Sequence, residues 1–313
     1  MIYPLLEKRF RVVHLLVTNI CTMGGCRYCY LSSTPASFNE LGTELLKVIA
    51  SQVNQLKVES IHVEGGETLE REDLPIILGA LNKRSRITVF TNGAIPYNVK
   101  FAPFKDIGGL FFSIDGPPAI HSLMRGVDVT TILMNMAEFR RAGFNVKVRA
   151  TLHRENIAFM KELVTMCNVQ GITAVRFGEF MPIGRGKFLK DDFGLRTEDI
   201  RAALENFSQV ALHYSPQIKL KLSLRGNYLA LAQNVCLAPN LDIKFIPCFA
   251  GREQFSICHN GDVLLCSESY YPQCVGSVKE KPLLEILEKI PQPVRSRCNH
   301  GHTIISNSEI NFE

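Results

Sequence analysis

Apolar and polar positions alternate with two different periods between residue 11 and about residue 180. Short apolar or β-branched runs are typical of strands, and the sequence predicts six of them, at 11–18, 59–64, 86–91, 109–115, 145–151 and 173–180. The longer stretches carry apolar residues at helical spacing, at 43–57, 72–83, 97–105, 128–142, 157–168 and, with Thr197 as a cap, 197–212. This repeated strand–helix order favours an α/β fold with a parallel sheet, either open or barrel-like.

The pattern changes near residue 236, where short runs, glycines and cysteines replace the strand–helix alternation. We therefore expect an α/β domain at 10–212, a connection at 213–235 and a small second module at 236–313. Polar clusters follow the ends of several predicted strands in the first domain. Because ligands bind at the carboxyl edge of parallel sheets, these clusters are candidate site residues.

Composition excludes several classes of protein. Of the 313 residues 46% are hydrophobic and 21% charged, as in an ordinary globular chain, and the net charge of +5 is spread along the sequence. A basic tract is absent, so we expect no nucleic-acid partner. No apolar run approaches the roughly 18 to 20 residues of a membrane span, and the first residues do not form a signal peptide. We expect a cytoplasmic protein without membrane contact.

Ten cysteines in a reducing compartment are either buried residues or metal ligands, and their spacing decides which. Cys21, Cys26 and Cys29 share one short loop directly after the first predicted strand. Three thiolates on one loop can hold three irons of a 4Fe–4S cluster and leave the fourth iron open. A zinc site is the alternative. It needs a fourth protein ligand, and the nearest histidines, His14 and His62, lie on predicted strands.

The cysteine loop resembles that of the radical S-adenosylmethionine (radical SAM) enzymes, whose signature is C-x3-C-x2-C after the first strand of a partial (β/α)6 TIM-like barrel. This chain has C-x4-C-x2-C, and the additional residue falls at Gly24-Gly25. Glycines adopt unusual dihedral angles at little steric cost, so they can absorb the insertion. The resemblance implies a 4Fe–4S cluster and S-adenosylmethionine as cofactors.

Residues at the ends of the other predicted strands match further motifs of that family. The resemblance implies that Gly65, Gly66 and Glu67 meet the methionine amino group of S-adenosylmethionine, that Ser113 and Asp115 bond the ribose hydroxyls, and that Arg149 pairs with the methionine carboxylate. Asn92 ends the third strand as in many relatives, and Tyr28 is expected beside the adenine. Taken singly, Asn92 could belong to a turn, Ser113 to an ordinary strand and Arg149 to a surface ion pair.

The C-terminal cysteines resemble the auxiliary-cluster module called SPASM or, in its shortened form, twitch. Asn260-Gly261 is a hairpin turn signal, and Cys266 follows it at the family's spacing. The resemblance implies a second, auxiliary 4Fe–4S cluster with Cys248, Cys266 and Cys298 as ligands and Cys274 as the fourth. His300 or His302 could replace Cys274, or the fourth iron could stay open.

Three further cysteines and one glycine-rich segment remain to be interpreted. Cys258 is either a core thiol, which we favour, or a hydrogen-atom donor. Cys167 and Cys236 are interpreted as plain buried residues. The segment Pro182-Ile183-Gly184-Arg185-Gly186 resembles a family segment that would lie along the adenine or the substrate channel, and otherwise is only a glycine-rich loop leaving the barrel.

The resemblance implies an enzyme of oxidoreductase or isomerase type that cleaves S-adenosylmethionine reductively to a 5′-deoxyadenosyl radical and takes a hydrogen atom from its substrate. We favour maturation of a ribosomally made peptide by cross-linking or epimerisation. Oxidation or epimerisation of a sugar or aminoglycoside is the alternative, and a non-catalytic iron–sulfur or zinc carrier is the alternative of another class. Expected partners are a flavodoxin- or ferredoxin-type electron donor and a separate peptide-recognition protein.

Overall fold

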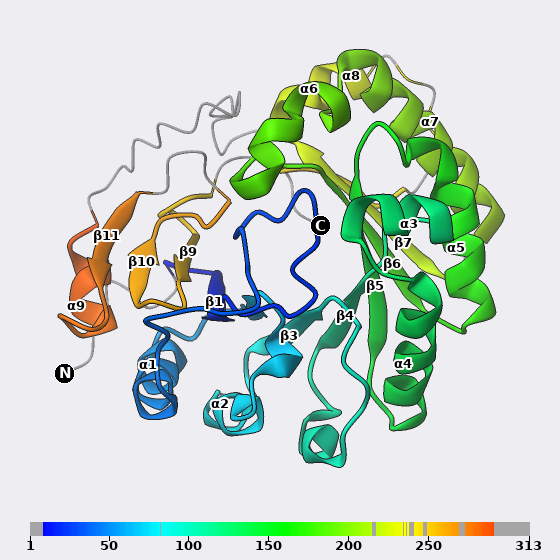
Figure 1. Ribbon diagram of the computed structural model, residues 1–313. Helices are drawn as coiled ribbons and strands as arrows, with labels where there is room; N and C mark the ends of the chain where they lie inside the picture. Colours follow the sequence, from blue (N-terminus) through cyan, green and yellow to red (C-terminus); the bar gives the residue numbers. More distant parts are fainter. Residues whose placement is uncertain are drawn as a thin grey trace.

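The structure is a computed structural model of the chain, and it describes residues 9–81, 83–214, 217–233, 235, 237, 241–246, 249–268 and 273–290. Eight parallel strands form a curved sheet in chain order (Figure 1). They are β1 (Val12–Thr18), β2 (Ser60–Gly65), β3 (Arg86–Thr91), β4 (Gly109–Ser113), β5 (Val146–Leu152), β6 (Ala174–Glu179), β7 (Lys219–Arg225) and β8 (Ile243–Ile246).

Helices cover the outer face of this sheet (Figure 1). The longer ones are α1 (Thr43–Gln55), α2 (Leu74–Ala80), α3 (Pro118–Arg125), α4 (Val129–Arg141), α5 (Met160–Val169) and α7 (Thr197–Tyr214), and α6 (Lys190–Phe193) and α8 (Leu229–Ala232) are single turns. Apolar faces of the helices pack against outward-facing strand residues such as Val146 and Val148 on β5. The sheet therefore has one face buried under helices and one face turned towards the inside of the open barrel.

The α/β class with a parallel sheet is confirmed. All six predicted strands are present with ends within two residues of the predicted ones. The interval 97–105 forms a 3-10 helix (Val99–Phe104) instead of an α-helix; it contains Pro103, which has no backbone N–H to donate. Helix α3 and strands β7 and β8 were not predicted. β7 lies inside the interval 213–235, which we expected to be a connection, and it extends the sheet beyond β6.

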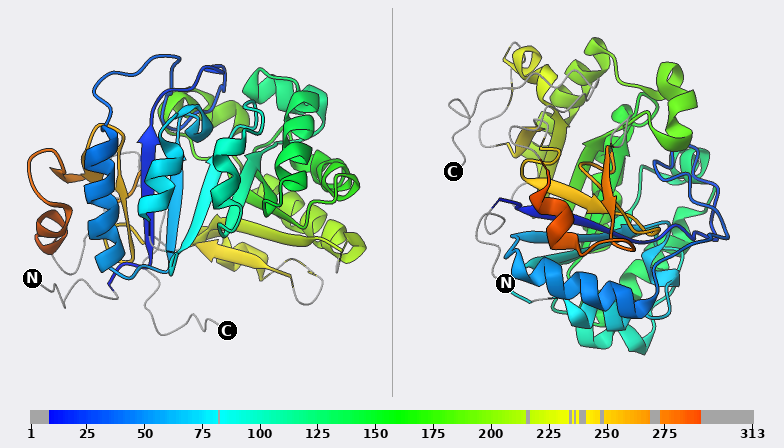
Figure 2. Two further views of the ribbon diagram at one scale, coloured as in Figure 1. Left: turned by 90° about the horizontal axis from the view of Figure 1, so that it is seen from below. Right: turned by 90° about the vertical axis from the view of Figure 1, so that its left-hand side faces the viewer.

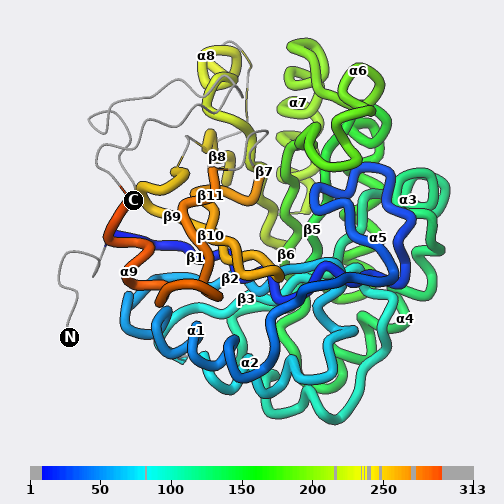
Figure 3. The backbone as a smooth tube through the Cα atoms, turned by 60° about the vertical axis from the view of Figure 1, so that its left-hand side comes forward, coloured from blue at the N-terminus to red at the C-terminus, as the bar shows by residue number. Residues whose placement is uncertain are grey.

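The C-terminal residues continue the same sheet on the side of β1. Strand β9 (Gln254–Ile257) pairs in parallel with β1, and β10 (Asp262–Leu264) and β11 (Cys274–Ser277) follow as antiparallel strands. Helix α9 (Leu283–Glu288) lies beside α1 (Figure 3), where the backbone N–H of Leu284 donates to Gln52. Within the described ranges, no helix is both long and apolar enough to span a membrane.

The inner face of the sheet is polar on β5, β6 and β7. On β5 the side chains of Lys147, Arg149 and Thr151 are partly exposed and alternate with buried apolar residues. The loop that follows β1 lies beyond the carboxyl ends of the strands (Figure 2). The architecture therefore places this loop over the opening of a polar barrel interior.

Candidate active site

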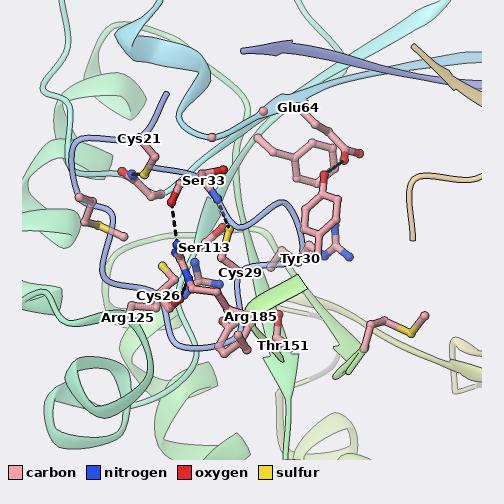
Figure 4. Close-up of a pocket in the computed structure, with 18 of the residues that line it drawn as sticks. Cys21, Cys26, Cys29, Tyr30, Ser33, Glu64, Ser113, Arg125, Thr151 and Arg185 are labelled. Carbon is pink, nitrogen blue, oxygen red and sulfur yellow. Dashed lines mark hydrogen bonds between the residues drawn. The ribbon is translucent and has the colours of Figure 1, made fainter. Parts of the chain in front are cut away.

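The loop after β1 brings Cys21, Cys26 and Cys29 to one pocket at the carboxyl ends of the strands (Figure 4). Gly24 has a φ of +52°, a left-handed conformation that favours glycine, so the insertion in the cysteine spacing is absorbed where the sequence predicted. Burial raises the pKa of the Cys26 thiol to about 11. Three thiols that face one pocket fit a cluster with an open iron, and their protons must leave when iron binds.

Gly65 and Gly66 at the end of β2 let the cysteine loop pass at close range. The N–H of Gly66 donates to the Thr18 carbonyl at 2.8 Å, and the N–H of Glu67 donates to the Ile20 carbonyl at 2.7 Å. A Cβ atom at Gly66 would lie 2.2 Å from the Ile20 carbonyl oxygen. The position therefore requires glycine for the loop to keep this path.

Glu67 lies behind the pocket and does not line it. Its buried carboxylate accepts hydrogen bonds from the Asn92 N–H at 2.6 Å and from the Thr91 hydroxyl at 2.8 Å. Burial raises the pKa of Glu67 to about 7, although these donors oppose the shift. The Asn92 side chain in turn reaches the Cys21 sulfur at 3.6 Å. In the structure this carboxylate supports Asn92, and its expected contact with S-adenosylmethionine stays a prediction.

Arg185, in the glycine-rich segment after β6, holds the cysteine loop (Figure 4). Its guanidinium donates to the carbonyl of Cys26 at 2.9 Å and to the carbonyl of Ser33 at 2.7 Å, and its backbone N–H donates to Cys29. Gly184 has a φ of +53°, and a Cβ atom there would lie 2.3 Å from the Tyr30 carbonyl oxygen. This segment, expected along the adenine or substrate channel, thus clamps the cysteine loop from the other side of the pocket.

Asp115 is fully buried, and protein donors occupy both of its oxygens. Arg125 donates to it at 2.6 and 3.3 Å, the Thr151 N–H donates at 2.9 Å, and the Tyr28 hydroxyl also donates. Burial opposes ionisation, but the Arg125 guanidinium lowers the pKa of Asp115 to about 2. Asp115 does not line the pocket, and the ribose contact expected of it stays a prediction. Its role here is to fix Arg125 and Tyr28, which do line the pocket.

Ser113 and Arg149 line the pocket as the sequence predicted. Arg149 lies 3.8 Å from Glu268, both side chains are 40% exposed, and its guanidinium lies 5.5 Å from the centre of the Phe90 ring. Because this ion pair is long and half-exposed, it leaves the guanidinium able to bind a ligand carboxylate. Glu268 follows β10, so the C-terminal module contributes one wall of the pocket.

A second polar group lies on the other side of the pocket from the cysteines. Glu64 accepts a hydrogen bond from the Tyr30 hydroxyl at 2.8 Å, and its other oxygen lies 3.0 Å from His14 Nδ1 and 3.7 Å from His62 Nδ1. The ligand atoms of His14, His62 and Glu64 lie within 4.8 Å of one another, and imidazole and carboxylate ligands suit zinc or iron. Sequence analysis placed these histidines on strands but did not identify Glu64 or Tyr30 as lining residues.

The cysteines of the C-terminal module are only partly within the described residues. Cys248, Cys298, His300 and His302 lie outside them, as does Cys236. Cys258 is half-buried, burial raises the pKa of its thiol to about 12, and it does not line the pocket. Cys266 lies 3.6 Å from the Gln254 amide, and Cys274 is exposed on β11. Cys167 is fully buried in α5, as expected.

Comparisons with known proteins agree with this geometry. The family model of the radical SAM superfamily matches residues 15–167, and that of an iron–sulfur cluster-binding domain (SPASM) matches residues 248–299. The AdoMet-dependent heme synthase of Nitratidesulfovibrio vulgaris is 24% identical over 87% of this chain and 77% of that protein. Pre-heme d1 synthase of Dinoroseobacter shibae is 29% identical over 51% of this chain and 41% of that protein.

A maturase is also similar to this chain. Mycofactocin maturase MftC of Mycobacterium tuberculosis is 27% identical over 54% of this chain and 44% of its own length. Among solved structures, Streptococcus suis SuiB bound to its precursor peptide SuiA has the same fold, with a TM-score of 0.75 and 18% identity over 90% of this chain and 66% of SuiB. For two of these three curated relatives, the chain spans less than half of their length.

Proposed function

The chain belongs to the radical SAM superfamily and carries a C-terminal SPASM domain, and on this premise we propose that it is an enzyme that removes a hydrogen atom from a substrate held inside the barrel. The radical SAM domain implies a 4Fe–4S cluster and S-adenosylmethionine, and the SPASM domain implies auxiliary iron–sulfur clusters. When bound, the cluster and its cosubstrate supply a 5′-deoxyadenosyl radical that attacks an unactivated C–H bond.

The residues of this chain have distinct tasks in the proposed reaction. Cys21, Cys26 and Cys29 would hold the cluster, and the loop contacts of Gly66 and Arg185 keep the three thiols facing one pocket. Ser113 and Arg149 would bind polar groups of S-adenosylmethionine, with the Arg149 guanidinium on the methionine carboxylate. The pocket wall formed by Glu268 links this site to the C-terminal module.

For the substrate, we propose a ribosomally made peptide that the enzyme cross-links or epimerises. Similarity to the mycofactocin maturase MftC supports this proposal, since that relative is named as a maturase. A flavodoxin- or ferredoxin-type protein would supply the electron, and a separate recognition protein would present the peptide.

A tetrapyrrole is the second candidate substrate. This candidate is favoured by the extent of the similarity to the heme synthase of N. vulgaris. That similarity covers 87% of this chain and reaches both matched domains. Tetrapyrrole intermediates carry carboxylate side chains, and a cationic barrel interior can accept them. The sugar or aminoglycoside alternative has no comparable support among these relatives.

The observation that carries the general proposal is the convergence of three cysteine thiols, the Gly65-Gly66 edge and Arg149 on one pocket. The test is anaerobic reconstitution with iron and sulfide, followed by dithionite and S-adenosylmethionine. We expect 5′-deoxyadenosine from the native protein and from Cys167→Ala, whose thiol is buried far from any polar partner in α5, and none from Cys26→Ala. A non-catalytic carrier would bind iron and yield no 5′-deoxyadenosine in any of the three.

A further inference from the structure

Three cations stand side by side on the inner face of the sheet. Arg149 on β5 is the register partner of Arg176 on β6, and Arg176 is the register partner of Lys221 on β7. Adjacent strands lie about 4.8 Å apart, so the three side chains leave the sheet at this spacing. All three are partly exposed, while the residues before and after each on its strand are more buried or face the helices. We name Arg149, Arg176 and Lys221 the cationic row.

A fourth cation, Lys147, lies on the same inner face of the sheet. Lys147, two residues before Arg149, lies 5.6 Å from the centre of the Phe111 ring, and Arg176 lies 4.7 Å from the same centre. Phe111 stacks on Phe90 at 5.4 Å with an interplanar angle of 22°. The barrel interior on this side is therefore an aromatic surface bordered by cations.

This arrangement costs stability in the absence of an anion, because like charges directly opposite one another on neighbouring strands repel. Burial lowers the pKa of Arg176 and of Lys221, and in each case neighbouring cations lower it further. Among the described residues, the carboxylates recorded near the cationic row include Glu268, at 3.8 Å from Arg149, and Glu64, whose pKa the Arg149 charge helps to lower. Asp242 offsets part of the effect on Arg176 and Lys221. Stacking on Phe90 and Phe111 holds two of these guanidinium groups in place, and an anionic ligand would stabilise the row against its own repulsion.

We infer that the substrate of this enzyme carries at least two carboxylates and that Arg176 and Lys221 bind them on the inner wall of the barrel. This inference rests on the proposed function, since it assigns the substrate class of the same site. Arg149 lines the pocket next to the cysteines and is left for the cosubstrate, whereas Arg176 and Lys221 do not line that pocket and lie farther along the wall. Carboxylates on separate arms of one molecule suit cations on separate strands better than one compact anion does.

Two classes of molecule supply this chemistry, an acidic peptide and a tetrapyrrole with carboxylate arms, and the experiment distinguishes them. The probes are hexaglutamate and coproporphyrin III, each paired with a neutral counterpart, hexaglutamine and coproporphyrin tetramethyl ester. Binding is measured anaerobically by calorimetry and fluorescence quenching on the reconstituted protein with S-adenosylmethionine present. We expect at least one carboxylate probe to bind tenfold or more tightly than its neutral counterpart, and less tightly as salt is added. The preferred probe identifies the source.

Variants of the cationic row test the assignment. Arg176→Gln and Lys221→Gln should each weaken the preferred carboxylate probe about tenfold, and Arg176→Lys should recover most of the loss. The matched control is Lys161→Gln, which removes an exposed cation from the outer helix α5 and should leave binding unchanged. The inference is overturned if neither carboxylate probe is preferred over its neutral counterpart, or if both Gln variants bind as the native protein does while their circular dichroism is native.

A separate measurement distinguishes failure of this inference from failure of the proposed function. Reductive cleavage of S-adenosylmethionine without substrate needs the cysteine pocket but not Arg176 or Lys221. The native protein and the control Lys161→Gln should therefore form 5′-deoxyadenosine with dithionite at equal rates, whether or not a carboxylate probe binds. If the native protein binds a carboxylate probe but makes no 5′-deoxyadenosine, the enzymatic proposal fails and the binding site stands.

Discussion

Replacing Arg185 with Met tests whether the cysteine loop is held from outside itself. The substitution removes the guanidinium but keeps an unbranched side chain, so the hydrogen bonds to the carbonyls of Cys26 and Ser33 are lost. Each charged hydrogen bond contributes about 1.5 kcal/mol at a half-buried position, which gives about 3 kcal/mol for the loop. A free energy of that size changes the equilibrium between the held and the released loop roughly 100-fold. Water can replace part of the lost hydrogen bonding, so we expect the cluster to be lost at least tenfold faster.

The assay follows iron release from the reconstituted protein to an excess of a coloured chelator under anaerobic conditions. The matched control is Arg154→Met. Arg154, like Arg185, donates to backbone carbonyls, in its case those of Asp191, Asp192 and Gly194, and none of these belongs to the cysteine loop. The control should lose global stability in urea without faster iron release. If Arg185→Met released iron at the same rate as Arg154→Met or as the native protein, the role of Arg185 in holding the cysteine loop would be refuted.

Three other changes have defined outcomes. Gly66→Ala places a Cβ atom 2.2 Å from the Ile20 carbonyl oxygen, so it should lower the free energy of unfolding by about 1–3 kcal/mol and reduce the iron content. The control Gly42→Ala, whose Cβ atom would have nothing within 4 Å, should change neither the iron content nor thermal unfolding. Asp115→Asn leaves the buried Arg125 without its counter-charge and should cost about 3–5 kcal/mol in urea unfolding. Because the folded-state pKa of Asp115 is about 2 against an ordinary 3.8, this contribution is complete above about pH 4 and is lost as the pH falls toward 2, so the difference between native and variant should be constant from pH 5 to pH 8. A variant without Cys21, Cys26 and Cys29 should still bind iron through the C-terminal module, and adding Cys266→Ala should remove that iron; an iron-free triple variant would contradict the auxiliary cluster.

The sequence predicted strands β1 to β6 because their periods are local properties. The cysteine loop, the Gly65-Gly66 edge and Ser113 were likewise identified, since each directly follows or ends a strand and parallel strands share one carboxyl edge. Arg149, in the middle of β5, was identified through the family resemblance. What sequence reasoning could not provide is which polar groups bond to one another across the fold. Asp115 and Glu67 are acidic residues in the right motifs, yet both are buried by protein donors from other elements. Their partners are fixed by tertiary packing and not by spacing.

Strand β7 is an instructive omission, because its signal was present. Lys219–Arg225 alternates Leu220, Leu222 and Leu224 with polar residues, which is the pattern of a strand with one polar face. The interval 213–235 was nevertheless interpreted as the connection to the small second module, because the strand–helix pattern changes near residue 236. The alternation on β5, β6 and β7 reflects a sheet face that turns into the barrel interior, and that polar face carries the cationic row.

The one-residue insertion in the cysteine spacing is tolerated for a reason that the contacts explain. The positions of Cys21 and Cys29 are set from outside the segment 21–29. The Thr34 carbonyl accepts the Cys21 N–H, and the Arg185 N–H donates to the Cys29 carbonyl. Between these fixed points the chain needs only a turn, and Gly24 supplies it in the left-handed region. The spacing between the first two cysteines can therefore change without moving the thiols, provided that glycine occupies the turn. Gly24→Ala should accordingly reduce cluster occupancy although its Cβ atom would meet nothing closer than 3.5 Å, because the strain lies in the backbone and not in a clash.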